Sequence, residues 1–427
     1  MSTFLFLPED LVVPKPGSPS LKNLKEAYLK RLLRETLAIA IQNRSWNLTP
    51  TLYELLAGAL KASPKSLLEI LSSPEISPIV WCYQRKNDFP NLKKPIEDAL
   101  QALPGSLLLS LSANKLLPPG GAKWMTSAEI ISHSLGFSMK LEEGRLGWHF
   151  GAGSVSALKS SGTEAQINLN SETLLGRRPA AAGIYSQLCY VTLKPPRPIK
   201  LALKDINPIA DIEAHPDKAG NALNLGGHSE EDWRAALAQC LDWISELWPE
   251  LFEEMEILLK QIVPVGYSDT WHLSASYREA VGTIYLTLHP HLLTMTEALI
   301  HEFQHNKMNM ASYFDIFLEN AFFPLYKSPV RPDPRPLWGV LLAVHAFLPV
   351  SEFYRKMRAA RHPVSQTPDF ERRIKEIDEK NREGMETLRM HARWTPAGRA
   401  LMKELEALET QHQDNKFFNS RLIARKI

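Results

Sequence analysis

The H-E-x-x-H pattern at residues 301–305 is the feature that most constrains how this chain can fold. His301 and His305 lie four residues apart, so on an α-helix they occupy one face, a single turn apart. Two imidazoles placed in this way can bind one divalent cation at about 2.0–2.1 Å. Glu302 adjoins the pair and can act on a metal-bound water or support the site by hydrogen bonds. The pattern therefore predicts a helix that carries a metal site.

The surroundings of the pattern agree with this prediction. Thr294 and Glu297 form T-x-x-E, which is typical of a capping box at the start of a helix. Just before it, GTIYLTL (282–288) is rich in β-branched and aromatic residues and predicts a strand. A strand followed directly by a capped H-E-x-x-H helix is how zincin-like sites are built.

A third protein ligand is needed, and several residues are candidates for it. The metzincin pattern is excluded, because Met308 and Ala311 stand where it requires glycine and histidine. His345, within LLAVHAFLPV, is the candidate that we favour, although a histidine in such an apolar run is otherwise a core residue. The remaining candidates are Glu319, His289 and His291.

The stretch YKSPVRPDPRPLWG (326–339) presents two arginines from a stiff backbone. Prolines flank Arg331 and Arg335, which lowers the entropy cost of holding a guanidinium in place. Rigid arginines suit the bidentate capture of a carboxylate. The alternative is an ordinary surface loop in which Asp333 pairs with one of the arginines.

The first part of the chain has helical periodicity, and strand patterns come later. Residues 183–193 and 199–203 predict strands, and a long amphipathic helical region at 229–263 is expected to break near Pro249. A buried helix is expected from about Leu337 to Met357, with a charged helical tail from about Asp369.

These patterns predict a mostly helical α+β fold. We expect a mainly helical N-terminal region at 1–180, which ends in a mixed segment up to about residue 180, as a candidate for peptide recognition. Residues 181–427 are expected to form a zincin-like metal-binding catalytic domain with a small sheet and a charged C-terminal helix.

Composition narrows the function class. The formal net charge of the 427 residues is +2, so nucleic acid and anionic membranes are not expected partners. The three cysteines are far apart, which argues against a disulfide scaffold and a thiolate zinc site. The longest apolar run is too short to span a bilayer, and the N-terminus does not have the pattern of a secretory signal. We expect a cytoplasmic enzyme; the sequence predicts no oligomeric state.

HEFQHNKMN, followed by SPVRPDPRPLWGVLLAVHAF, resembles the HEXXH-motif family of peptide-modification proteins found with ribosomally made, post-translationally modified peptides. The resemblance covers about residues 270–360. It implies Fe(II)- and 2-oxoglutarate-dependent hydroxylation of side-chain carbons in a precursor peptide. The chain departs from the family pattern at Val330, where tryptophan is usual, and at Leu342, where histidine is frequent.

Carried onto this chain, the resemblance implies that His301 and His305 bind iron, with His345 as the candidate for the remaining ligand. Arg331 and Arg335 are then candidates to hold the distal carboxylate of 2-oxoglutarate. Glu302 would orient a ligand rather than act as a base.

Two other functions fit the same pattern. In a zinc metallopeptidase, Zn²⁺ would activate water and Glu302 would be the general base. A non-catalytic peptide-binding protein with an incomplete metal site is the third alternative.

Overall fold

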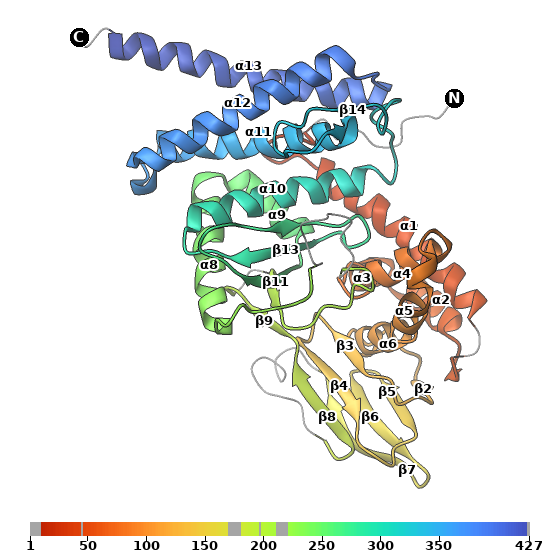
Figure 1. Cartoon of the computed structure of the whole chain (residues 1–427). Coiled ribbons are helices and arrows are strands. Elements are labelled where there is room, and N and C mark those ends of the chain that lie inside the picture. The colour runs from red at the N-terminus through yellow and green to blue at the C-terminus, as the bar shows by residue number, and fades with distance from the viewer. Residues whose placement is uncertain (1–9, 44–45, 170–180, 196–197, 211–220, 425–427) are drawn as a thin grey trace.

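Helices make up both ends of the chain, and most strands lie between them (Figure 1). The computed structural model describes all residues except 1–9, 44–45, 170–180, 196–197, 211–220 and 425–427, and it omits the side chains of 164–165 and 415–424. This is the mostly helical α+β fold that the sequence predicts.

The N-terminal helices begin where the sequence places cap residues and prolines. Thr51 and Glu54 form a reciprocal capping box at the start of α2, and Ser63 caps α3 ahead of Pro64. Leucines on these helices face a common core. The helices are α1 (Ser20–Gln42), α2 (Leu52–Ala62), α3 (Pro64–Leu71), α4 (Ser77–Gln84), α5 (Lys93–Leu100) and α6 (Leu103–Ala113).

The mixed segment after α6 consists of antiparallel strands in two sheets, ordered β1-β2-β5-β6-β7 and β3-β4-β8. β1, which precedes α2 in the chain, joins the first of these sheets beside β2. The predicted strand at 183–193 divides into β8 and β9, which belong to different sheets. The helical part of the N-terminal region thus ends at Ala113, while a domain boundary at residue 180 stays a prediction. The strands are β1 (Leu48–Thr49), β2 (Ala122–Trp124), β3 (Ile130–Ser132), β4 (Phe137–Leu141), β5 (Gly147–Gly151), β6 (Ser154–Lys159), β7 (Gly162–Asn168) and β8 (Ile184–Leu188).

A further five-stranded sheet, ordered β12-β13-β11-β10-β9, supports the H-E-x-x-H helix. Its middle strands run parallel, while β12 and β9 are antiparallel at the two edges. Every residue of β13 is buried, as expected of a strand covered on both faces. The strands are β9 (Tyr190–Thr192), β10 (Lys200–Ala202), β11 (Gln261–Tyr267), β12 (Ser274–Ala275) and β13 (Thr283–Leu288).

Two helices precede β11, and the predicted break at Pro249 is confirmed. α8 (Glu230–Leu247) ends before Trp248, and α9 (Pro249–Leu258) starts with the proline, whose missing N–H costs nothing at a first helical position. The end of this region was predicted to be helical, but it forms the start of β11. Lys260 and Gln261 instead donate backbone N–H bonds to Gly282.

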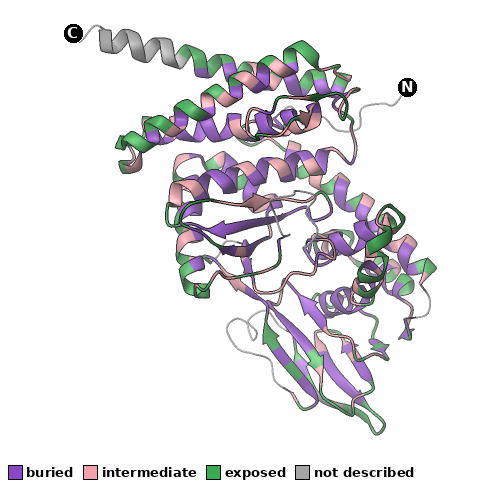
Figure 2. Cartoon of the chain, in the orientation of Figure 1, coloured by how far each residue is buried: buried purple, intermediate pink, exposed green. Residues whose placement is uncertain are grey.

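Three helices close the fold around α10 (Leu292–Ala311). α11 (Leu337–Ala359) packs against α10 and against α12 (Pro368–His391) and α13 (Pro396–Ala424). Buried residues run along α10 and α11 (Figure 2). Within the described part of the chain, α11 alone is long and apolar enough to cross a membrane, and most of its apolar stretch is buried in the protein, as in a core helix.

Candidate metal centre

The helix that carries the motif starts earlier than predicted. α10 begins at Leu292 with His291 as its N-cap, so the predicted capping box of Thr294 and Glu297 is wrong. His289 helps to shape this start, because its Nδ1 accepts a hydrogen bond from the His291 N–H at 3.0 Å. Glu297 lies within the helix and is available for a different role.

α10 brings His301, Glu302 and His305 together, as the predicted helix requires. One ligand atom from each residue lies within 4.8 Å of the others, and in the described part of the chain no other group of three or more acids, cysteines and histidines does this. The two imidazole centroids are 4.4 Å apart, and both rings are half-buried. The group is therefore partly shielded and still open on one side.

The protonation state of both histidines suits a metal ion. Burial, helped by the charges of His305 and Arg331, holds the pKa of His301 well below its usual value, and burial also lowers the pKa of His305. The Nδ1 atoms of both rings are buried and have no hydrogen-bond partner among the described residues. Neutral imidazoles with unused nitrogens are the form that binds a metal, so these residues fit one.

Glu302 is held by two serines from the edge of the sheet. Its Oε1 accepts a bond from the Ser274 hydroxyl at 2.7 Å, and its Oε2 accepts one from the Ser276 hydroxyl at 2.8 Å. Ser274 belongs to β12, so strand and helix together fix the direction of a buried carboxylate. Neither serine could be identified from the sequence, since both lie more than twenty residues away from Glu302.

His345 is a fully buried residue of α11 and lies outside the three-residue group. Its Nε2 contacts the Leu11 carbonyl oxygen at 3.1 Å, while its Nδ1 has no hydrogen-bond partner among the described residues. Burial lowers its pKa to about 3, so the ring is neutral. The contact with Leu11 is that of a core histidine, and its role as a ligand stays a prediction.

The other candidates for a third ligand do not join the group either. α10 ends at Ala311, so Glu319 is not on the same helix. The Glu319 side chain is exposed, and its backbone N–H donates to the Arg393 carbonyl. His289 is buried and His291 is exposed at the helix start.

The two arginines of the proline-rich loop differ in their surroundings. Arg331 is exposed, and its charge lies close enough to help lower the pKa of His301. Arg335 forms an ion pair with Asp333, with Nε 2.7 Å from Oδ2, which is the surface pairing considered as the alternative. Of these two arginines, Arg331 is therefore the one near His301, and it forms no ion pair with an acid among the described residues.

A third arginine near His301 was not predicted from the sequence. Arg373 of α12 donates both from Nε, at 3.0 Å, and from a terminal nitrogen to the carboxylate of Glu297, which also accepts the Tyr354 hydroxyl at 3.1 Å. Its charge also helps to lower the pKa of His301, one turn beyond Glu297. Glu297, four residues before His301 on the same face, was the available signal, but its partner lies 76 residues away.

No protein-family model matches the chain, and no curated protein matches it significantly.

Proposed function

We propose that this chain is a metal-dependent enzyme that hydroxylates side chains of a peptide, using Fe(II) and 2-oxoglutarate. The observation that carries the proposal is the group of His301, Glu302 and His305, with the charge of Arg331 beside it. Two imidazoles are usual among the ligands of non-haem iron oxygenases. The positive charge suits an anionic cosubstrate.

Each residue has a definite task in this proposal. His301 and His305 supply two nitrogens, His345 is the candidate for the third ligand, and Glu302 orients a ligand. Arg331 attracts the distal carboxylate of 2-oxoglutarate, and Ser274 and Ser276 keep the Glu302 carboxylate in one direction. Iron bound here would supply the oxidising chemistry together with O2 and 2-oxoglutarate.

A peptide substrate is supported by the position of β12. The predicted strand at 282–288 is β13, which lies inside the sheet between β11 and β12 and has no free edge. β12 is the edge strand, and no strand of the described chain pairs with its outer side. A peptide added to that side would lie next to the strand whose Ser274 holds Glu302.

The same edge strand favours one alternative, a zinc metallopeptidase. Glu302 would then take a proton from a zinc-bound water and pass it to the leaving amine. Both of its oxygens already accept serine hydroxyls, which lowers their basicity, so we place this alternative second.

We also infer that the protein acts in the cytoplasm. All three cysteines are buried and form no disulfide, as expected in a reducing compartment. Such a compartment keeps iron in the Fe(II) state that the proposed reaction needs.

Anaerobic reconstitution tests the proposal. The protein is loaded with Fe(II) or, separately, with Zn²⁺ and mixed with 2-oxoglutarate, and succinate is measured before and after O2 is admitted. We expect succinate only with iron and O2, and a gain of one oxygen on a peptide encoded beside the gene. Succinate formed equally without O2 would contradict the proposal, and peptide cleavage by the zinc form alone would favour the peptidase.

The Glu302→Gln variant separates the two mechanisms. In a peptidase it removes the base, and cleavage should fall by about a hundred-fold or more. In the hydroxylase the amide still accepts a serine hydroxyl, and part of the succinate formation should remain. Metal content measured in the same samples shows whether the site still binds the ion. A complete loss of succinate with full metal content would argue against the hydroxylase assignment.

A further inference from the structure

A polar pocket lies between the N-terminal helices and the sheet that supports α10. Its volume is about 330 Å³. Its walls come from α3, α6, the turn after β3, the start of β10 and the residue before β11, and none of them belongs to α10. The lining residues that matter here are Ser66, Ser110, His133, Ser134, Lys200 and Lys260.

Two lysines bring positive charge to this pocket. The Lys200 ammonium donates to the backbone carbonyls of His133 and Ser134, the second at 3.2 Å, so one of its three hydrogens remains for another acceptor. Neither Lys200 nor Lys260 forms an ion pair with an acid of the described chain. Glu69 also lines the pocket, but it is exposed and lies 3.8 Å from the Lys25 ammonium.

Burial lowers the pKa of Lys200 to about 8, opposed by the charge of Glu75. An anion bound beside the Lys200 ammonium would stabilise its charged form.

Ser110 gives an independent indication of a ligand. Its side chain is 2% exposed and lines the pocket, and its Oγ has no hydrogen-bond partner among the described residues. A serine inside a helix commonly bonds the carbonyl four residues earlier, and this hydroxyl does not. A buried unpaired hydroxyl is unfavourable, and a bound acceptor would satisfy it.

We propose that this pocket binds a phosphate group, either free phosphate or the phosphate of a small phosphomonoester. A phosphate offers several acceptor oxygens and a charge near −2, which match the Lys200 and Lys260 ammoniums and the Ser110 hydroxyl. The pocket is at the lower end of the size range of small-molecule sites, so it has room for a short organic group beside the phosphate.

Binding is tested by calorimetric titration of the full chain with inorganic phosphate, glycerol 3-phosphate and, as an uncharged control, glycerol. We expect saturable binding of one or both anions and none of glycerol. Tighter binding of glycerol 3-phosphate would assign the pocket to a phosphomonoester, and tighter binding of inorganic phosphate would assign it to the free anion. Absence of saturable binding of either anion would overturn the proposal.

Two variants and a matched control locate the binding. Lys260→Met should weaken it by about ten-fold or more. Lys65→Met, an exposed lysine of α3 that does not line this pocket, should leave it unchanged. Ser110→Ala should weaken binding yet leave the melting temperature of the phosphate-free protein equal or higher, because it removes an unpaired hydroxyl. Equal binding by the Lys260→Met and Lys65→Met proteins would overturn the proposal.

Discussion

At the scale of single residues, Arg331 and Arg335 are four positions apart but differ in charge environment. The guanidinium of Arg335 is paired with Asp333. The charge of Arg331 instead helps to lower the pKa of His301. Neutralising Arg331 therefore removes an attraction for the cosubstrate, while neutralising Arg335 removes mainly a surface ion pair.

Arg331→Met should raise the KM for 2-oxoglutarate by about ten-fold or more, because a charged hydrogen bond to a carboxylate contributes about 1.5–3 kcal/mol. Arg335→Met is the matched control and should change KM by about two-fold or less. Initial rates of succinate formation at varied 2-oxoglutarate measure both. Equal effects of the two variants would show that Arg331 has no special role.

Glu75 is a buried carboxyl whose pKa depends on folding. Burial raises its pKa from 4.5 to about 7, although its Oε1 accepts the His133 N–H at 3.0 Å. The folded protein thus keeps a proton there that the unfolded chain releases near pH 4.5. The stability from this group is complete below that pH and is lost as pH rises through about 7, by up to about 3 kcal/mol.

Glu75→Gln should remove this pH dependence. The glutamine oxygen can still accept the His133 N–H, so the variant should match the wild type near about pH 5 and exceed its free energy of unfolding by about 2–3 kcal/mol near about pH 8. Urea unfolding at the two pH values measures the difference. The same gap at both pH values would show that Glu75 is ionised in the folded protein throughout.

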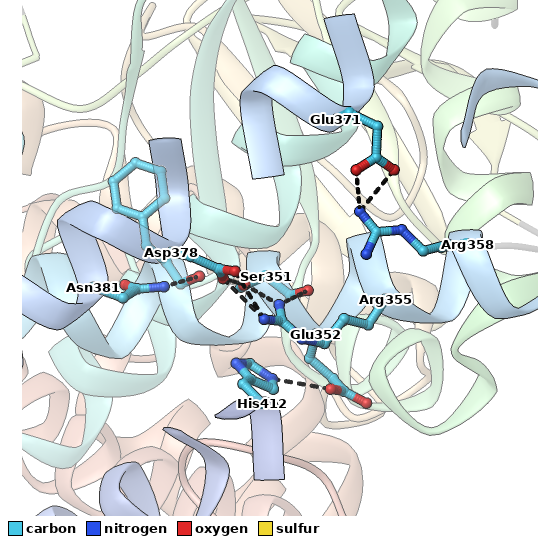
Figure 3. A network of polar contacts seen from close by, with 9 residues as sticks. Ser351, Glu352, Arg355, Arg358, Glu371, Asp378, Asn381 and His412 are labelled. Carbon is cyan, nitrogen blue, oxygen red and sulfur yellow. Dashed lines mark hydrogen bonds and ion pairs between the residues drawn. The ribbon is translucent and has the colours of Figure 1, made fainter. Parts of the chain in front are cut away.

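At the scale of elements, buried polar contacts join the last three helices (Figure 3). Arg355 of α11 donates to both oxygens of Asp378 in α12, at 3.0 and 2.9 Å, and Ser351 donates to the same carboxylate. His412 of α13 lies 3.0 Å from Glu352 of α11. These contacts fix how α12 and α13 lie against the helix that carries His345.

Asp378→Asn should lower the free energy of unfolding by about 3 kcal/mol, because it leaves a largely buried guanidinium without its anion. Glu371→Gln, which removes the exposed partner of Arg358 on the same two helices, should cost about 1 kcal/mol or less. Thermal and urea unfolding of both variants provide the comparison. Equal losses would indicate that the Arg355 pair is not buried in solution.

Elements with strong local patterns could be predicted from the sequence, whereas long-range pairings could not. The periodicity of α1, the proline at the start of α9 and the β-branched run of β13 each identify one element. The start of α10 was placed wrongly because T-x-x-E also fits a helix interior, where Glu297 binds Arg373 from another helix. Ser274 and Glu302 are in contact because β12 lies at the edge of the sheet beside β13, and no local sequence pattern predicts that strand order.

At the scale of the whole molecule, a short segment near the N-terminus is buried among the helices around the metal centre. The Val12 carbonyl accepts a bond from Gln304 of α10, and the Val12 N–H donates to Glu404 of α13. The Leu11 carbonyl contacts His345 of α11. Parts of the chain that are almost four hundred residues apart therefore form one core, which explains why sequence analysis could not assign the surroundings of His345.

Lys307 is at the centre of this core. It is 1% exposed and its ammonium lies 2.7 Å from the Glu254 carboxylate. Glu254→Leu should cost about 3 kcal/mol of unfolding free energy, because it leaves the buried Lys307 ammonium without its anionic partner. Lys307→Met should cost less, since burial already raises the pKa of Glu254 and the carboxyl can become neutral. The double variant with Glu254→Leu should recover most of the loss, as an apolar pair fills the same space. Urea unfolding of the four proteins forms a double-mutant cycle, and additive losses would mean that the two charges do not interact.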